Sequence, residues 1–236
     1  MIVTGGAKGI GRAVTERFRA SGDRVVAVGR DAAALADLGG RACDVTDEDA
    51  VVALFGDLGP VDVLVNNAGV AESAPLQRTT LASWRRHLDV NATGAFLCTR
   101  AALPAMLERD AGRVVTVAST AGRVGTRYTA AYTASKHAAV GLMRAVAAEV
   151  AGTGVTANAV CPAFADTELT RRSVARIAEA TGRDEDAARA ALERASPLGR
   201  LLDPGEVADA VVWLASPAAA AVNGQTLVLD GGGVQA

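Results

Sequence analysis

Short runs of apolar, mostly β-branched residues alternate along the chain with longer segments in which apolar residues recur at helical spacing. The short runs predict strands at 2–3, 25–28, 61–65, 114–117, 155–160 and 226–229, with a weaker candidate at 41–43. Between them lie segments with helical spacing, which predict helices at 10–20, 32–38, 47–55, 81–107, 132–150 and 204–215. Strands that are apolar on both faces and alternate with helices are typical of a parallel sheet covered on two sides.

Right-handed crossovers between such strands give a doubly wound open sheet. We therefore expect an α/β fold of the Rossmann type with about seven strands and helices on both faces, as one domain over residues 1–236. Residues 166–196 are charged and helical, and they interrupt the alternation. A solvated helical excursion would account for them. Because insertions at the carboxyl edge of such a sheet lie over the ligand site, we favour a small substrate lid at 166–200.

Composition, charge and residue spacing argue against nucleic-acid, membrane and metal partners. The net charge is −2, whereas a nucleic-acid partner would require a basic surface. No apolar run reaches the roughly 20 residues that span a bilayer, so we expect no membrane partner. Cysteines without CxxC spacing indicate reduced, buried thiols in a cytoplasmic protein: Cys43, Cys98 and Cys161. Neither His87 nor His137 has a partner at metal-ligand spacing, so we expect no metal site and a structural or surface role for both.

A glycine-rich turn follows the first predicted strand and opens the next helix, with the sequence TGGAKGIG at 4–11. Glycines allow a sharp turn and the close approach of a diphosphate, while a helix N-terminus offers free N–H groups and the positive end of its dipole. A tight structural turn would use the same residues. The strand before and the helix after favour a dinucleotide site, built from Gly5, Lys8, Gly9, Ile10 and Gly11.

The end of the second predicted strand should lie beside the adenosine ribose of a dinucleotide. Gly29 stands where an acidic residue would favour NAD, and Arg30 follows it. A guanidinium matches a 2′-phosphate bidentately, and Lys8 could add a second cation, so we expect NADP to be preferred over NAD. The competing interpretation is that Arg30 only caps the loop and that Asp31 caps the next helix.

Small and polar residues also follow the third and fourth predicted strands. Asp44, beside Val45, could accept a hydrogen bond from the adenine amino group, although capping of the next helix is an alternative. Asn67, Ala68 and Gly69 would let a ligand lie against the backbone, while the amides tie neighbouring strands together. These positions all fall at carboxyl strand ends, where such sheets bind their ligands.

Tyr132 and Lys136 are four residues apart and therefore share one face of a predicted helix. A phenol with a pKa near 10 is a poor base at neutral pH, but a nearby ammonium can lower that pKa by about 1–3 units. For such a pair alone, a plain surface contact is the alternative. Ser119 follows the fifth predicted strand and lies upstream of the pair.

In this order and spacing, the motifs resemble those of the short-chain dehydrogenase/reductase family over essentially the whole chain. The matching pieces are TGxxxGIG at 4–11, CDV at 43–45, NNAG at 66–69, Asn91, Ser119, YxxxK at 132–136 and NGQTLVLDGG at 223–232. The resemblance implies interconversion of a ketone and a secondary alcohol with a nicotinamide cofactor. The chain looks most like the branch that reduces 3-oxoacyl thioesters of coenzyme A or an acyl carrier with NADPH.

The resemblance also implies a catalytic tetrad. Tyr132 would exchange a proton with the substrate oxygen, and Ser119 would hydrogen-bond the same oxygen. Lys136 would lower the pKa of Tyr132, and the two would hold the nicotinamide ribose. Asn91 would hold a water that links Lys136 to solvent.

Other family features concern the cofactor and the assembly. Asp44 and Val45 would hold adenine, and Pro162 and Thr167 would lie at the nicotinamide end. Ala163 stands where the family usually has glycine. A homotetramer of D₂ symmetry is implied, with contacts through the apolar helix at 207–214 and the C-terminal strand.

The substrate is the least defined part of the prediction. The candidate pocket is apolar with few charges, which suits an acyl chain or a neutral ring: Ser73, Ala74, Ser119, Val124, Tyr128, Phe164 and Leu169. Arg171 and Arg172 could meet a pantetheine phosphate or be two solvated arginines. An NAD-linked 3-hydroxyacid or secondary-alcohol dehydrogenase is an alternative function. A non-catalytic NADP-sensing module is another, against which the complete tetrad argues.

Overall fold

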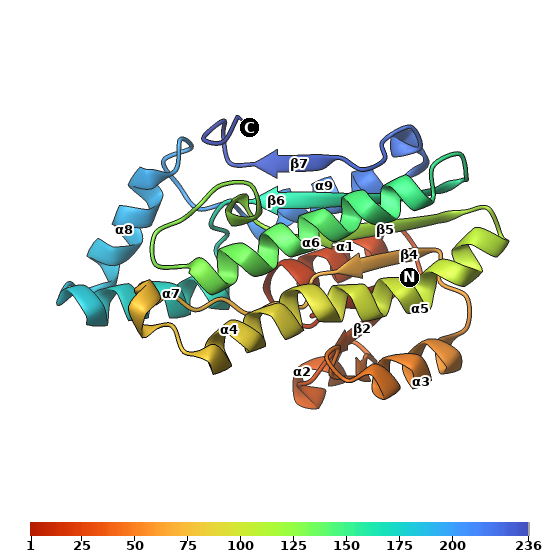
Figure 1. Ribbon diagram of the computed structural model, residues 1–236, viewed down its shortest axis with the longest axis horizontal. Helices are drawn as coiled ribbons and strands as arrows, with labels where there is room; N and C mark the ends of the chain where they lie inside the picture. Colours follow the sequence, from red (N-terminus) through yellow and green to blue (C-terminus); the bar gives the residue numbers. More distant parts are fainter. Residues whose placement is uncertain (236) are drawn as a thin grey trace.

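The computed structural model describes residues 1–235. Its strands form one parallel sheet in the order β3-β2-β1-β4-β5-β6-β7 (Figure 1). The strands are β1 Ile2–Thr4, β2 Val26–Gly29, β3 Arg41–Ala42, β4 Val63–Asn66, β5 Gly112–Val117, β6 Val155–Pro162 and β7 Thr226–Leu229. The direction of winding reverses between β1 and β4, as in a doubly wound sheet. The predicted Rossmann-type fold is therefore confirmed.

Helices connect the strands and cover both faces of the sheet (Figure 1). They are α1 Gly9–Ala20, α2 Ala32–Ala36, α3 Glu48–Leu58, α4 Leu81–Leu88, α5 Gly94–Glu108, α6 Ala130–Glu149, α7 Glu168–Thr181, α8 Glu185–Ala195 and α9 Pro204–Ala215. Successive strand residues point to opposite faces. Ile2 and Leu64 accordingly belong to the core under α3, α5 and α6. Val3 and Val65 belong to the core under α1 and α9.

The prediction of one helix over 81–107 is wrong in one respect. α4 and α5 are joined by a π-helical turn, Asp89–Thr93. Such a turn holds one extra residue, and π turns are frequent at functional sites. Asn91 lies within it, with its side chain buried. One extra residue hardly alters the apolar spacing, so the sequence pattern could not reveal the turn.

The segment after β6 forms two packed helices, α7 and α8. A small apolar cluster joins them, formed by Val174, Ala178 and Ala188. Figure 1 shows both helices at the end of the sheet toward which the strand arrows point. The helical character predicted for 166–196 is confirmed, and the function of this segment as a lid stays a prediction.

Three further features bear on the kind of protein. In the described part of the chain, no helix has the length and apolar character needed to cross a membrane. Cys43, Cys98 and Cys161 are free and buried. Residues 1–235 contain no group of three or more His, Cys, Asp or Glu that could hold a metal ion.

The packing of α9 on the sheet can be tested by truncation. Leu214 is 1% exposed, so Leu214→Ala should lower the free energy of unfolding by about 2–5 kcal/mol through lost burial and a residual cavity. Leu76 is 71% exposed, so Leu76→Ala should change it by no more than about 0.5 kcal/mol. Urea denaturation measures both, and equal effects would contradict the core described here.

Candidate active site

The glycine turn at 4–11 adopts a conformation that depends on its glycines. Gly5 and Gly9 have φ angles of 62° and 51°, in the left-handed region that disfavours side chains. A Cβ at Gly11 would lie 2.2 Å from the carbonyl oxygen of Gly5, so Gly11 allows the turn to pack on α1. Lys8 is the N-cap of α1 but makes no side-chain cap. The first N–H groups of α1 are therefore available to an anionic ligand.

A first cleft, of about 390 Å³, lies over the carboxyl ends of β1, β2 and β4. It brings together most of the predicted cofactor residues: Gly5, Lys8, Gly9, Ile10, Arg30, Asp44, Val45, Asn67, Ala68, Gly69 and Thr167. Four predicted cofactor residues do not line it, contrary to expectation: Gly11, Tyr132, Lys136 and Pro162. Gly11 is buried beneath the turn, and Pro162 is a buried strand residue paired with Leu229.

Charged side chains at the first cleft are paired with one another. Lys8 Nζ lies 2.7 Å from Asp31, and Arg30 lies 3.8 Å from Asp44. The Lys8–Asp31 hydrogen bond raises the pKa of Lys8 and lowers that of Asp31. Asp31 also caps α2 by accepting from the Ala34 N–H at 3.1 Å. The capping role considered for Asp31 is thus present, while Arg30 lines the cleft.

Arg171 and Arg172 are both ion-paired within their own segment. Arg171 lies 3.6 Å from Asp166, and Arg172 pairs with Glu168. Arg172 lines the first cleft, where the dinucleotide residues gather. The idea that this pair meets a pantetheine phosphate of the substrate is therefore not supported by its position.

The ends of β1 and β4 are tied by side-chain hydrogen bonds, as predicted for the amides there. The Thr4 hydroxyl accepts from the N–H groups of Asn67 and Ala68, each at 3.0 Å. Asn67 Nδ2 in turn donates to the Thr4 carbonyl at 3.0 Å. These bonds fix the floor of the first cleft.

Three predicted catalytic residues meet where β5 ends beside α6. Tyr132 is half-buried and hydrogen-bonded to Ser119. Lys136 is only 6% exposed. Its Nζ donates to the Val117 carbonyl at 2.9 Å and lies 5.8 Å from the centre of the Tyr132 ring. The Ser119 oxygen also accepts from the Ala121 N–H at 3.1 Å, which fixes the side chain. The tyrosine–lysine pair is therefore an interior pair and not a surface contact.

Loss of hydration dominates the titration of both groups. It lowers the pKa of Lys136 to about 8. It raises the pKa of Tyr132, against the lowering effect of the Ser119 hydrogen bond. The net direction is therefore opposite to the lowering expected from Lys136, whose own contribution stays a prediction. Burial disfavours the phenolate, and the ammonium is directed at the Val117 carbonyl.

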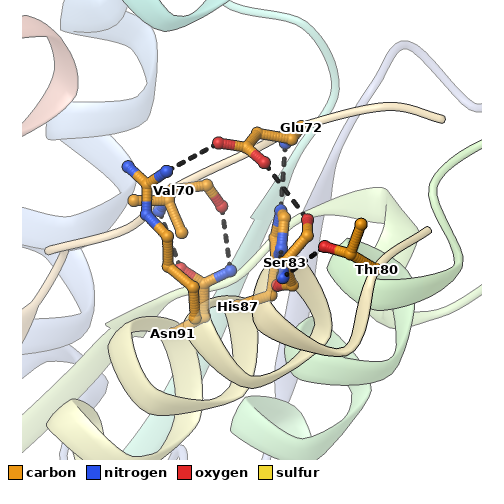
Figure 2. Close-up of polar contacts among 7 residues, drawn as sticks. Val70, Glu72, Thr80, Ser83, His87 and Asn91 are labelled. Carbon is orange, nitrogen blue, oxygen red and sulfur yellow. Dashed lines mark hydrogen bonds and ion pairs between the residues drawn. The ribbon is translucent and has the colours of Figure 1, made fainter.

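Asn91 clamps the residues that follow β4. Its Nδ2 donates to the Val70 carbonyl at 3.0 Å, and its Oδ1 accepts the Val70 N–H at 2.8 Å (Figure 2). Nδ2 also donates to Ser135 Oγ at 2.9 Å. A Cβ at Gly69 would lie 3.3 Å from Asn91 Oδ1 and 3.7 Å from Lys136 Nζ, so the two side chains are neighbours. Both amide hydrogens bind protein atoms, so the expected water link does not use them.

His87 lies beside the Tyr132 phenol, in a position that its sequence context did not reveal. It is fully buried. Its Nδ1 lies 2.7 Å from the Ser83 carbonyl, and its Nε2 accepts the Glu72 N–H at 3.0 Å (Figure 2). A carbonyl only accepts and an N–H only donates, which assigns the neutral Nδ1–H tautomer. The ring stands edge-on to Tyr132, with centroids 6.3 Å apart. The structural role expected for His87 is confirmed.

A second cleft, of about 220 Å³, lies beside the start of α6. Its lining is Glu72, Ser73, Ala74, Arg78, Thr79, Thr80, Ser83, Tyr128, Ala130, Ala131 and Arg176. Ser73, Ala74 and Tyr128 were predicted pocket residues. The other four predicted pocket residues do not line the second cleft. Leu169 lines the first cleft, and Ser119, Val124 and Phe164 line neither. Hydroxyls and two arginines also contribute to the wall of this cleft.

Comparison with known proteins decides the family. The family model described as enoyl-(acyl carrier protein) reductase matches residues 5–233. This chain belongs to the short-chain dehydrogenase/reductase family. As a member of that family it is an oxidoreductase that acts on CH–OH groups and uses a nicotinamide cofactor. The resemblance drawn from the motifs is thereby confirmed.

Relatives within this short-chain dehydrogenase/reductase family differ in their named substrates. Cis-4-hydroxycyclohexanecarboxylate dehydrogenase of Sinomonas cyclohexanicum is 41% identical over 98% of this chain and 94% of its own. The 3-oxoacyl-(acyl-carrier-protein) reductase MabA of Mycobacterium bovis is 37% identical over 98% and 91%. Actinorhodin polyketide ketoreductase with NADPH superimposes with a TM-score of 0.93 at 36% identity, covering 100% of this chain and 97% of that one.

The first cleft fits the cofactor of a short-chain dehydrogenase/reductase. Gly5 and Gly9 leave the turn free of side chains, and the uncapped N-terminus of α1 suits a diphosphate. Arg30 and Lys8 offer cations at the end of β2. Lys136 Nζ approaches Gly69 of the same cleft, where it would hold the nicotinamide ribose.

The buried cation should have a measurable cost. In the folded state Lys136 has a pKa of about 8, below its ordinary value of 10.5. The folded protein is therefore penalised fully below pH 8, and the penalty fades as pH rises to 10.5 because the folded lysine loses its proton first. Lys136→Met should raise Tm at pH 7, and this gain should shrink between pH 8 and 10.5.

Thermal unfolding of both proteins across this pH range measures the difference. The only other lysine in the sequence, Lys8, provides the control. It lies in an exposed ion pair, so Lys8→Met should give no such gain. A gain for Lys136→Met that does not vary with pH would contradict the lowered pKa.

Proposed function

We propose that the protein reduces a ketone to a secondary alcohol with NADPH, and that its substrate is a 3-oxoacyl thioester or a close analogue. One observation carries the proposal: Tyr132 is hydrogen-bonded to Ser119, with Lys136 Nζ 5.8 Å from its ring. Lys136 adjoins Gly69 of the first cleft. Ala131 lines the second cleft. These contacts support a phenol that lies between the space for a dinucleotide and the space for a substrate.

The residues of this site supply the proton and hold the carbonyl. When bound, the nicotinamide supplies the hydride. Tyr132 donates its hydroxyl proton to the carbonyl oxygen as negative charge develops there. Ser119 donates a hydrogen bond to the same oxygen and stabilises that charge. The Lys136 ammonium stabilises the resulting phenolate until a proton from solvent restores it, and the reverse transfers apply to alcohol oxidation.

Two cations support NADP as the preferred cofactor. Arg30 and Lys8 line the first cleft, and Gly29 leaves no acidic side chain at the last position of β2. Arg30 is only loosely paired with Asp44, at 3.8 Å, so a 2′-phosphate can take its guanidinium. The superimposed ketoreductase holds NADPH, which agrees with this preference.

A second candidate function is NAD-linked oxidation of a 3-hydroxyacid or another secondary alcohol. The similarity to a dehydrogenase of a hydroxycyclohexanecarboxylate favours it. The similarity to MabA favours the 3-oxoacyl thioester. A cofactor-sensing module without turnover is disfavoured, because Asn91, Ser119, Tyr132 and Lys136 are all present.

The segment 166–200 is proposed to act as a lid. Thr167, Glu168, Leu169 and Arg172 line the first cleft, so movement of α7 would open or close it.

A homotetramer is proposed through α9 and β7. The apolar face of α9 is used within its own core, which leaves Trp213, 43% exposed, for a subunit contact. A cytoplasmic location is also proposed.

Removal of the phenol hydroxyl tests the chemistry. Tyr132→Phe should abolish nearly all turnover, because no other group is placed to donate the proton, and it should leave NADPH binding unchanged. Thr133→Val is the control and should keep its turnover, since it removes a hydroxyl from the next position of α6, which lines neither cleft and hydrogen-bonds Thr129 at 3.0 Å. Steady-state rates with acetoacetyl-CoA and cofactor fluorescence titrations provide the readouts. Turnover near the wild-type rate in Tyr132→Phe would refute the assignment.

The cofactor preference depends on one guanidinium. Arg30→Ala should raise the KM for NADPH about tenfold or more and leave the KM for NADH nearly unchanged, because only NADPH has the 2′-phosphate. Arg41→Ala, an exposed arginine outside the first cleft, is the control. Kinetics with both cofactors at saturating ketone measure the effect. A higher wild-type kcat/KM with NADH would overturn the preference.

A further inference from the structure

The second cleft is formed by segments that are far apart in the sequence. The connection from β4 to α4 supplies Arg78, α7 supplies Arg176, and the start of α6 supplies Ala131. His87 binds the backbone of Glu72 and Ser83 in the cleft wall, and its ring stands edge-on to Tyr132 with centroids 6.3 Å apart. One buried side chain therefore connects the cleft to the phenol that is proposed to react. The position of the cleft makes it the space into which the rest of a substrate extends from the reacting carbonyl.

The charge in this cleft is positive and unbalanced. Among residues 1–235, neither Arg78 nor Arg176 has a carboxylate within ion-pair distance, whereas Arg171 and Arg172 on the same α7 are paired. Glu72 is the only acidic residue in the lining. Its carboxylate is already bound by Arg86 at 2.7 Å and by Ser83 Oγ at 3.1 Å. Two guanidiniums therefore face the cleft without a partner anion.

One residue of the cleft lining is held in a strained backbone conformation. Tyr128 has a φ angle of 66°, a value that costs a non-glycine residue about 1–3 kcal/mol. Its carbonyl accepts the Ala74 N–H at 2.7 Å, which joins two linings of the cleft. Strain of this kind clusters at ligand sites, where the surrounding structure maintains it.

We propose that the second cleft is an anion subsite for the substrate, in which Arg78 and Arg176 bind an oxyanion remote from the reacting carbonyl. The inference rests on the proposed function, since it takes Tyr132 as the reacting group. The oxyanion is the carboxylate of a small keto acid or a phosphate of a pantetheine thioester. The volume of about 220 Å³ is below the roughly 300–1,000 Å³ of pockets for drug-sized ligands. It suits the charged end of a substrate and not a whole acyl chain.

Pairs of ketones that differ in charge test the subsite. The first pair is 4-oxopentanoate and its methyl ester, and the second is acetoacetyl-CoA and acetoacetyl-N-acetylcysteamine. Arg78→Gln and Arg176→Gln should each lower kcat/KM for the charged member about 10- to 100-fold, because each loses a charge-assisted hydrogen bond. The neutral member should change by less than about twofold. Loss confined to the first pair identifies a carboxylate, and loss confined to the second identifies a phosphate.

The controls separate this inference from the proposed function. Arg85→Gln and Arg183→Gln remove exposed arginines outside both clefts and should leave kcat/KM for all four ketones unchanged. If Arg78→Gln and Arg176→Gln affect charged and neutral ketones equally, the subsite is refuted while ketone reduction stands. If the wild type reduces no ketone, the proposed function fails. Calorimetric binding of both ketone pairs to the NADP-loaded protein then still decides the subsite: tighter binding of a charged member, lost in the two variants, supports it, and equal binding within both pairs refutes it.

Discussion

The site is organised around an ammonium group that has almost no access to water. Lys136 is buried between β5 and α6, and its Nζ is bound by a single backbone carbonyl, that of Val117. Such a charge is unfavourable away from solvent, which is why its pKa falls to about 8. Gly69 leaves space beside it that any side chain would occupy. The fold therefore maintains a buried cation beside the Tyr132 ring and the first cleft.

The loop that follows β4 contributes residues to both clefts. Val70 lines the first cleft, and Glu72, Ser73 and Ala74 line the second. The loop has little secondary structure of its own, so side chains from the helical stretch that follows hold it. Asn91 binds the Val70 backbone at both its N–H and its carbonyl. His87 accepts the Glu72 N–H (Figure 2). A short polar network thus sets the relative position of the first and second clefts.

Periodicity and motif order predicted the sheet, most helices and most residues of the first cleft, because these depend on local spacing and on the rule that parallel strands end at one edge. What the sequence could not show arises from tertiary packing. The direction of the Tyr132 pKa depends on how completely the phenol is desolvated. Arg78 and Arg176 belong to segments without any sequence relationship, and only the fold brings them to one cleft. Arg172 looked like a substrate residue because it lies in the inserted helices, yet it lines the first cleft.

The π-helical turn at Asp89–Thr93 has an evolutionary consequence. Each residue of a regular helix advances the chain by about 100° around its axis. Deleting the extra residue would restore an ordinary helix, but it would rotate everything after the turn by that angle. Leu97 and Cys98 of α5 would then leave the core that they now fill. The π-helical turn that holds Asn91 and the core packing of α5 therefore depend on each other. A change in one would require a change in the other.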